Sequence, residues 1–158
     1  MNRFSPRALV TVALLARSGL AWSVDSAGPS NDKLSAARAR IAESNFSGAI
    51  EELQKVNDPN SADWNNLMGY SMRKQATPDL AAAERYYNEA LRIDPKHRGA
   101  LEYSGELYLM NGDLPKAEDR LSALDKACRF SCQEYRDLKK AVERFKANGN
   151  KYVAGSTW

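Results

Sequence analysis

The chain has 158 residues, of which 43% are hydrophobic and 27% charged, enough for one domain with a sizeable core. Its formal net charge is +3, but three of its basic residues, Arg3, Arg7 and Arg17, precede the first acidic one. The remaining 20 basic residues balance 20 acidic ones, which argues against a basic surface for nucleic acid or acidic lipid. We therefore expect no nucleic-acid partner and no membrane contact beyond the N-terminal segment.

The N-terminal segment has the layout of a secretory signal peptide. Two arginines precede an apolar run over 8–16, and Ala21 and Ser23 stand at the minus-three and minus-one positions of a possible cleavage site. About nine apolar residues are too few to span a bilayer. We expect a signal peptide over 1–23 and export to the periplasm, with an uncleaved anchor or an unstructured cytoplasmic extension as the alternatives.

Two irregular segments flank the expected helical domain, which covers 33–147. Residues 24–32 are rich in Ser, Gly, Pro, Asp and Asn, which favour turns and supply no core, so they predict a flexible lead-in. Residues 148–158 predict a C-terminal tail. Its aromatic residues Tyr152 and Trp158 either stay loose or fold back onto the last helix or a partner.

Apolar side chains at spacings of three and four predict helical hairpins along the domain. The first and weakest hairpin covers 34–56 and breaks at Asn45. The second covers 63–91, and Asp63 is placed to cap its first helix. Thr77-Pro78 has the pattern of a cap followed by proline at the first helical position, where the second helix would begin.

The third hairpin, over 100–124, has the clearest pattern. Asn111-Gly112-Asp113 predicts the turn between its helices, and Pro115 falls in the first turn of the second helix, where its missing N–H costs little.

Two glycines, Gly69 and Gly105, lie inside predicted helices, where glycine costs about 1 kcal/mol relative to alanine. We expect the compensation to be a close helix crossing. Tyr87 or Leu121 from the second helix of the hairpin would approach the first, and a larger residue would overpack the contact.

A last helix is predicted over 132–147. Ser131 and Glu134 fit a capping box, in which the serine accepts from the helix and the glutamate reaches back. Tyr135, Leu138, Val142 and Phe145 form one apolar stripe. We expect this helix to close the array, because stacked repeats need a terminal element with a polar outer side.

A period of 34 residues runs through the domain. Ala49, Ala83 and Ala117 are 34 apart, and each is followed by a larger apolar residue four positions on and another apolar one seven positions on. This is the period of a stacked helix-turn-helix unit. Such units share one continuous core and leave an extended surface for a partner, so the pattern favours a binding module over a catalyst.

With these anchors placed, the chain resembles the tetratricopeptide repeat family over about 33–127, and in particular short exported bacterial members. The first repeat departs from the family pattern, with Ala37 in place of glycine and Arg40 where a large apolar residue belongs. The resemblance implies an all-α, right-handed solenoid of three helical hairpins plus the capping helix. The family's small, large and proline positions are occupied by Gly69, Met72, Ala83, Tyr87, Ala90 and Pro95, and then by Gly105, Tyr108, Ala117, Leu121 and Leu124, with Arg129 where proline would stand.

The resemblance also implies a concave groove, lined by the first helix of each repeat, that holds a segment of a partner protein. Glu102 and Glu106 would lie one turn apart and could pair with basic groups of a ligand or with Arg73. Some relatives clamp a C-terminal carboxylate, but acidic residues occupy part of that position set here. The implied groove residues are Asn66, Tyr70, Arg73, Lys74, Glu102, Glu106, Leu109 and Met110, with Tyr70, Leu109 and Met110 as apolar anchors.

Cys128 and Cys132 are the only cysteines and lie between the third hairpin and the last helix. In an exported protein such a pair predicts a disulfide. A thiol-redox pair is the alternative, because Cys132 would lie at a helix N-terminus that lowers a thiol pKa. A soft-metal site is the other alternative, although His97 is the only histidine and further ligands are lacking.

We expect no enzyme, cofactor or resident metal, because the sequence has neither a recognisable catalytic triad nor a Gly-rich phosphate loop. The leading hypothesis is a non-enzymatic adaptor or scaffold of the bacterial envelope. A thiol or metal accessory protein is the alternative, and self-association through the first repeat is a third possibility.

Overall fold

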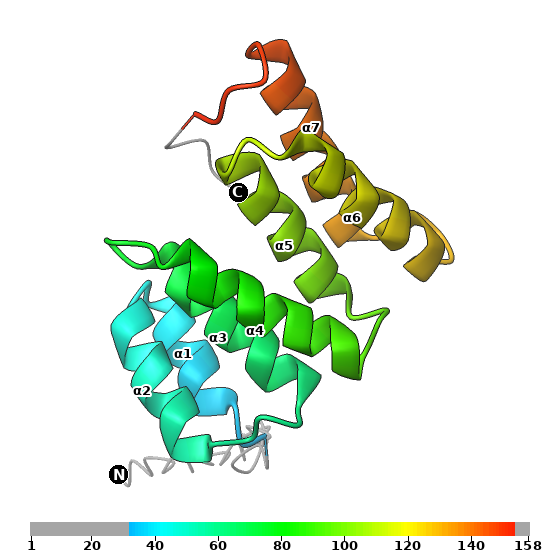
Figure 1. Cartoon of the computed structure of the whole chain (residues 1–158). Helices are drawn as coiled ribbons and strands as arrows, with labels where there is room; N and C mark the ends of the chain where they lie inside the picture. Colours follow the sequence, from blue (N-terminus) through cyan, green and yellow to red (C-terminus); the bar gives the residue numbers. More distant parts are fainter. Residues whose placement is uncertain (1–31, 154–158) are drawn as a thin grey trace, which may run out of the picture. The chain divides into compact units, whose positions relative to one another are not determined.

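The computed structural model describes residues 32–153, which form seven α-helices and no strand (Figure 1). The expected signal peptide over 1–23, nearly all of the lead-in and the end of the tail with Trp158 lie outside these residues. The helices are α1 (Ser35–Ala42), α2 (Phe46–Val56), α3 (Ala62–Lys74), α4 (Leu80–Ile93), α5 (Arg98–Met110), α6 (Leu114–Ala127) and α7 (Gln133–Ala147).

Consecutive helices pack as antiparallel hairpins, α1 with α2, α3 with α4 and α5 with α6, and each hairpin contacts the next. The last helix, α7, packs against both α5 and α6. This arrangement confirms the prediction of an all-α helical solenoid with three hairpins and a terminal helix.

The core lies between the helices in two clusters of buried side chains. One joins the first hairpin to α3 around Leu53 and Met68, and the other runs from α4 to α7. The three alanines that mark the 34-residue period are completely buried. The period therefore records positions where only a small side chain fits between the helices.

The helices begin at capping residues that differ from the predicted ones. The Ser61 hydroxyl accepts a hydrogen bond from the Trp64 N–H at 3.2 Å and caps α3, so Asp63 lies inside the first turn. The Asp79 carboxylate accepts from the Ala82 N–H at 2.8 Å and caps α4, which begins at Leu80. The prediction of caps at Asp63 and Thr77 was wrong, because a suitable oxygen two residues away satisfies the N–H groups in each case.

The predicted capping box of the last helix is also absent. Cys132 is the N-cap residue of α7 and makes no side-chain cap, while the carboxylate of Glu134 lies 3.6 Å from Arg98 Nε on α5. The Glu134 side chain therefore forms an ion pair between α7 and α5 instead of capping α7. Pro115 does lie in the first turn of α6, as predicted.

Gly69 and Gly105 both lie at close helix crossings, although the crossing at Gly105 has an unexpected partner. A Cβ added to Gly69 would lie 2.8 Å from Tyr87 Cδ1, which confirms the predicted contact within the second hairpin. A Cβ added to Gly105 would lie 2.5 Å from Leu138 Cδ2, so this crossing involves α7 and not Leu121 of α6.

The disulfide between Cys128 and Cys132 is confirmed. It joins the C-cap of α6 to the N-cap of α7 and so fixes where the terminal helix begins. The loop that it closes exposes Phe130, which is 90% accessible. Further on, Tyr152 packs against the larger core cluster. Between residues 32 and 153, no helix combines the length and the apolar character needed to cross a membrane.

We expect Gly69→Ala to lower the free energy of unfolding by about 1–3 kcal/mol, because the Tyr87 ring is fully buried and cannot move aside. The measurement is chemical denaturation of the single variants and of the double variant with Tyr87→Leu. Leucine frees the space, so Gly69→Ala in that background should be neutral or stabilise by up to about 1 kcal/mol through helix propensity. Additive effects of the two substitutions would contradict this contact.

Reduction of the disulfide should lower the free energy of unfolding by only about 2 kcal/mol, because the loop over 128–132 is short. Denaturation with and without reductant measures the change, and the double variant Cys128→Ser, Cys132→Ser should match the reduced protein. Alkylation followed by mass measurement should label no thiol before reduction and two after it. Labelling of the untreated native protein would show that the bond is not formed.

Candidate partner-binding groove

A pocket of about 350 Å³ lies among α1, α3, α5 and α7. The first three are the first helices of the repeats, to which the groove was assigned, whereas α7 was predicted only as a capping helix. Its volume falls in the range of roughly 300–1,000 Å³ that is usual for ligand sites. We call it the central pocket; its lining includes Arg38, Asn66, Tyr70, Glu102, Tyr103 and Glu134.

An asparagine and a glycine face each other in the central pocket. Asn66 of α3 is only 7% exposed, and its Oδ1 atom is buried without a hydrogen-bond partner among the described residues. Gly99 of α5 lines the same space, and a Cβ added there would lie 3.1 Å from Asn66 Nδ2. The missing side chain at Gly99 therefore keeps the pocket open beside a polar atom that lacks a partner.

Glu102 of α5 is the buried carboxylate of the pocket, with 8% of its surface exposed. Within residues 32–153 it makes neither a hydrogen bond nor an ion pair. Burial raises the pKa of Glu102 to about 8, and the negative charges of Glu106, Asp137 and Glu134 contribute, while Arg73 opposes the change. A carboxylate in these surroundings is held at a cost in free energy.

Glu106, one turn further along α5, has a partner inside the protein. Arg73 Nη2 of α3 donates to Glu106 Oε2 at 2.7 Å, and both side chains are almost completely buried. Burial raises the pKa of Glu106, although Arg73 opposes it. Arg73 Nε also donates to the Tyr87 hydroxyl at 3.4 Å. Of the two pairings considered for Glu106, the structure has the one with Arg73, so this carboxylate is not available to a ligand.

Two tyrosine rings form one wall of the pocket. Tyr70 and Tyr103 have ring centroids 4.7 Å apart, and the Arg73 guanidinium carbon lies 5.6 Å from the first centroid and 5.7 Å from the second. Phe46 of α2 meets the Tyr70 ring edge-on at 6.0 Å. Tyr70 is half-buried, and burial raises the pKa of its hydroxyl. The wall is thus held from inside by the buried arginine and still presents aromatic surface to the pocket.

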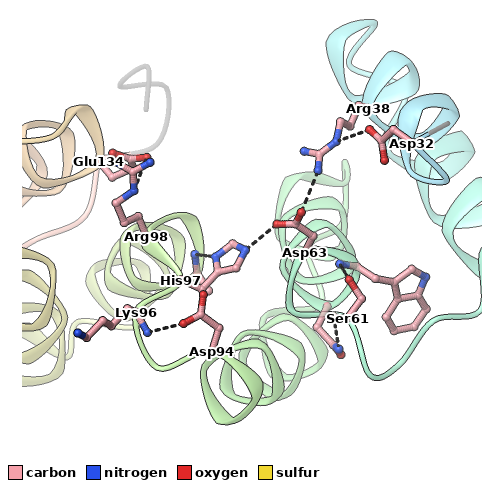
Figure 2. A network of polar contacts seen from close by, with 12 residues as sticks. Asp32, Arg38, Ser61, Asp63, Asp94, Lys96, His97, Arg98 and Glu134 are labelled. Carbon is pink, nitrogen blue, oxygen red and sulfur yellow. Dashed lines mark hydrogen bonds and ion pairs between the residues drawn. The ribbon is translucent and has the colours of Figure 1, made fainter. Parts of the chain in front are cut away.

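An ion pair and a hydrogen bond, both made by Asp63, link the first, third and fifth helices near the pocket, as Figure 2 shows. The Asp63 carboxylate lies 3.4 Å from Arg38 Nη2 of α1 and 2.9 Å from His97 Nε2. His97 Nδ1 accepts from the Ala100 N–H at 3.0 Å and caps α5, so the neutral imidazole carries its proton on Nε2 and donates to Asp63. Asp63 therefore joins three helices instead of capping one.

Seven of the eight predicted groove residues fall into three groups. Asn66, Tyr70 and Glu102 line the central pocket, whereas Arg73 and Glu106 form the buried pair beneath it. Lys74 and Met110 are half-buried and lie outside the pocket lining, with Met110 Sδ 3.9 Å from Arg73 Nη1.

The assignment of Leu109 to the groove was wrong, because its side chain is fully buried in the core cluster and offers no surface to a ligand. Six residues of the pocket lining were outside the predicted groove set, namely Arg38, Ile41, Leu67, Gly99, Tyr103 and Glu134. Tyr103 is the counterpart of Leu67 at the 36-residue spacing of Asp58-Pro59 and Asp94-Pro95, and both line the pocket. The 36-residue spacing could have identified Tyr103, whereas Glu134 was assigned to a capping box and so was not considered for the groove.

The cysteine pair lies outside the central pocket. Both sulfur atoms are used by the disulfide, so neither is a thiol or a metal ligand in this state. Among residues 32–153, no three His, Cys, Asp or Glu side chains are grouped as a metal site would require.

The raised pKa of Glu102 predicts a specific pH dependence of stability. The folded protein binds a proton at Glu102 up to about pH 8, whereas the unfolded chain releases it near its usual value, so this contribution to stability is complete at low pH. It should be lost progressively as the pH rises to about 8. Denaturation curves of the wild type and Glu102→Gln should diverge over that interval, with the variant gaining relative stability. Parallel curves would contradict the raised pKa.

The comparison with known families gives one match. The sequence model described as Tetratricopeptide repeat matches residues 78–142, which cover the helices from α4 to most of α7. No curated protein matches the chain significantly. The matched region contains Ala83, Gly105 and Ala117, the small residues at the helix contacts described above. Together with the three packed hairpins, this match supports a tetratricopeptide repeat protein.

Proposed function

We propose that this protein is an adaptor or scaffold of the bacterial envelope, which holds a segment of another protein in the groove lined by α1, α3, α5 and α7. Tetratricopeptide repeats generally mediate protein–protein binding, and the family typically consists of non-enzymatic scaffolds. The layout of residues 1–23 as a signal peptide supports the location.

The central pocket is the observation that carries this proposal. Four helices contribute to one pocket, whose lining includes an aromatic surface at Tyr70, the buried Asn66 Oδ1 without an internal partner, and the unpaired carboxyl group of Glu102. A buried polar group without a partner costs free energy unless a ligand supplies the missing interaction. An extended segment with one side chain directed into the pocket would do so.

The cysteine pair has no part in this proposal. It joins α6 to α7, and its contribution is to the position of the helix that carries Glu134. The exposed aromatic ring of Phe130 in the disulfide loop is the competing surface for a partner and serves as a control below.

The test is affinity capture from an envelope extract, followed by identification of the bound protein and direct measurement of its affinity. Gly99→Gln should abolish binding, because it fills the pocket beside Asn66 without removing an internal contact. Tyr70→Ala should weaken binding by at least about fivefold, since truncation of a central aromatic anchor usually costs more than about 1 kcal/mol. Glu106→Lys is unsuitable, because it would leave Arg73 buried beside a second cation.

Phe130→Ala is the matched control, because it removes an aromatic side chain that lies outside the groove. It should leave binding unchanged. A partner that is lost on Phe130→Ala and retained by both Gly99→Gln and Tyr70→Ala would place the interface at the disulfide loop and refute the groove. Thermal unfolding of each variant verifies that the fold is intact.

A further inference from the structure

We propose that the central pocket binds the guanidinium group of an arginine in the partner segment, with Glu102 as its counter-charge. This inference rests on the function proposed above and names the chemistry that the pocket selects. Glu102 and Asn66 Oδ1 are both acceptors, both lie in residues more than nine-tenths buried, and neither has a hydrogen-bond partner among residues 32–153. These two acceptors therefore lack a donor that carries positive charge.

The other carboxylates near the pocket already have partners. Glu106 is paired with Arg73 at 2.7 Å, and Glu134 lies 3.6 Å from Arg98. Glu102 thus remains the unpaired carboxyl group of the lining, and a bound cation would replace its proton.

The basic residue of the lining does not offset this charge. Arg38 Nε lies 3.4 Å from Asp32 and its Nη2 lies 3.4 Å from Asp63, so two carboxylates surround its guanidinium. These two carboxylates neutralise the charge of Arg38. In addition, Asp137 and Glu134 add negative potential at Glu102. The local balance therefore selects against an anionic ligand and for a cation.

A guanidinium fits these acceptors better than an ammonium does. It is planar and presents five N–H donors in a fixed arrangement, so it can donate to a carboxylate and to a neighbouring amide oxygen at once. Its flat face can also lie against a tyrosine ring, and Tyr70 and Tyr103 line the pocket. The buried Arg73, within 6 Å of both ring centroids, shows that this wall already accommodates a guanidinium on its inner side.

The experiment uses the full chain, labelled with ¹⁵N, and four acetylated and amidated pentapeptides that are identical except for the central residue. That residue is arginine, lysine, glutamate or citrulline, which has the shape of arginine without its charge. N-acetyl-arginine amide serves as a fifth probe. Titrations to about 10 mM peptide saturate even a millimolar site. The signals of the Gly99 amide and the Asn66 side-chain amide report binding in the pocket.

The arginine peptide should shift these signals and bind at least about tenfold more tightly than the citrulline peptide, with lysine between them, because charge-assisted hydrogen bonds are the stronger ones. Glu102→Gln should remove the preference for arginine over citrulline. Glu51→Gln, which alters an exposed glutamate on α2, should keep it. Glu102→Gln keeps the size of the side chain without an ionisable group and is expected to fold, which the reporter spectrum itself verifies.

Equal affinity for arginine and citrulline, a preference that survives Glu102→Gln, or the absence of shifts with every peptide would each overturn the proposal. If N-acetyl-arginine amide binds as tightly as the pentapeptide, the pocket serves a free small cation and not a polypeptide side chain. The two proposals can fail separately. If capture depends on Tyr70 and Gly99 but the peptides show no preference for arginine, only the arginine proposal is refuted. If capture is insensitive to substitution of both residues, the groove proposal is refuted.

Discussion

The buried ion pair of Arg73 and Glu106 is the interaction on which the groove depends. It joins α3 of the second repeat to α5 of the third at 2.7 Å, in a place where both side chains are almost fully buried. A replacement by well-packed apolar residues could be equally stable, but loss of one partner would leave the other charge buried and uncompensated. The guanidinium also supports the Tyr70 and Tyr103 rings, so the same residue fixes the helix pair and the wall of the pocket.

This pair separates the roles of two glutamates that look alike in the sequence. Glu102 and Glu106 lie one turn apart on α5, and both are more than nine-tenths buried. Glu106 faces Arg73 and becomes part of the scaffold, whereas Glu102 faces the pocket among other carboxylates and has its pKa raised to about 8. The two glutamates differ because each contacts a different neighbour, and the sequence pattern of α5 alone does not reveal those neighbours.

The same distinction explains what could be predicted from the sequence. Apolar spacing located all seven helices, and the small residue at Gly69 correctly indicated the approach of Tyr87, because both patterns are local to one hairpin. The caps at Asp63 and Glu134 were misassigned because each carboxylate meets a cation on another helix. Leu109 was assigned to the groove by repeat position, yet at the end of α5 it faces the core. Contacts between repeats, and not within them, were the missing information.

The terminal helix illustrates how a non-repeated element completes a site built on repeats. Leu138 of α7 lies against Gly105, at a crossing so close that a Cβ on the glycine would come within 2.5 Å of it. This contact and the disulfide at its start bring α7 onto α5, and Glu134 consequently joins the pocket lining. Its carboxylate pairs with Arg98, yet it still adds negative potential at Glu102. The 34-residue period therefore specifies a scaffold shared by many proteins, whereas the charge of this pocket depends on a helix that the period does not include.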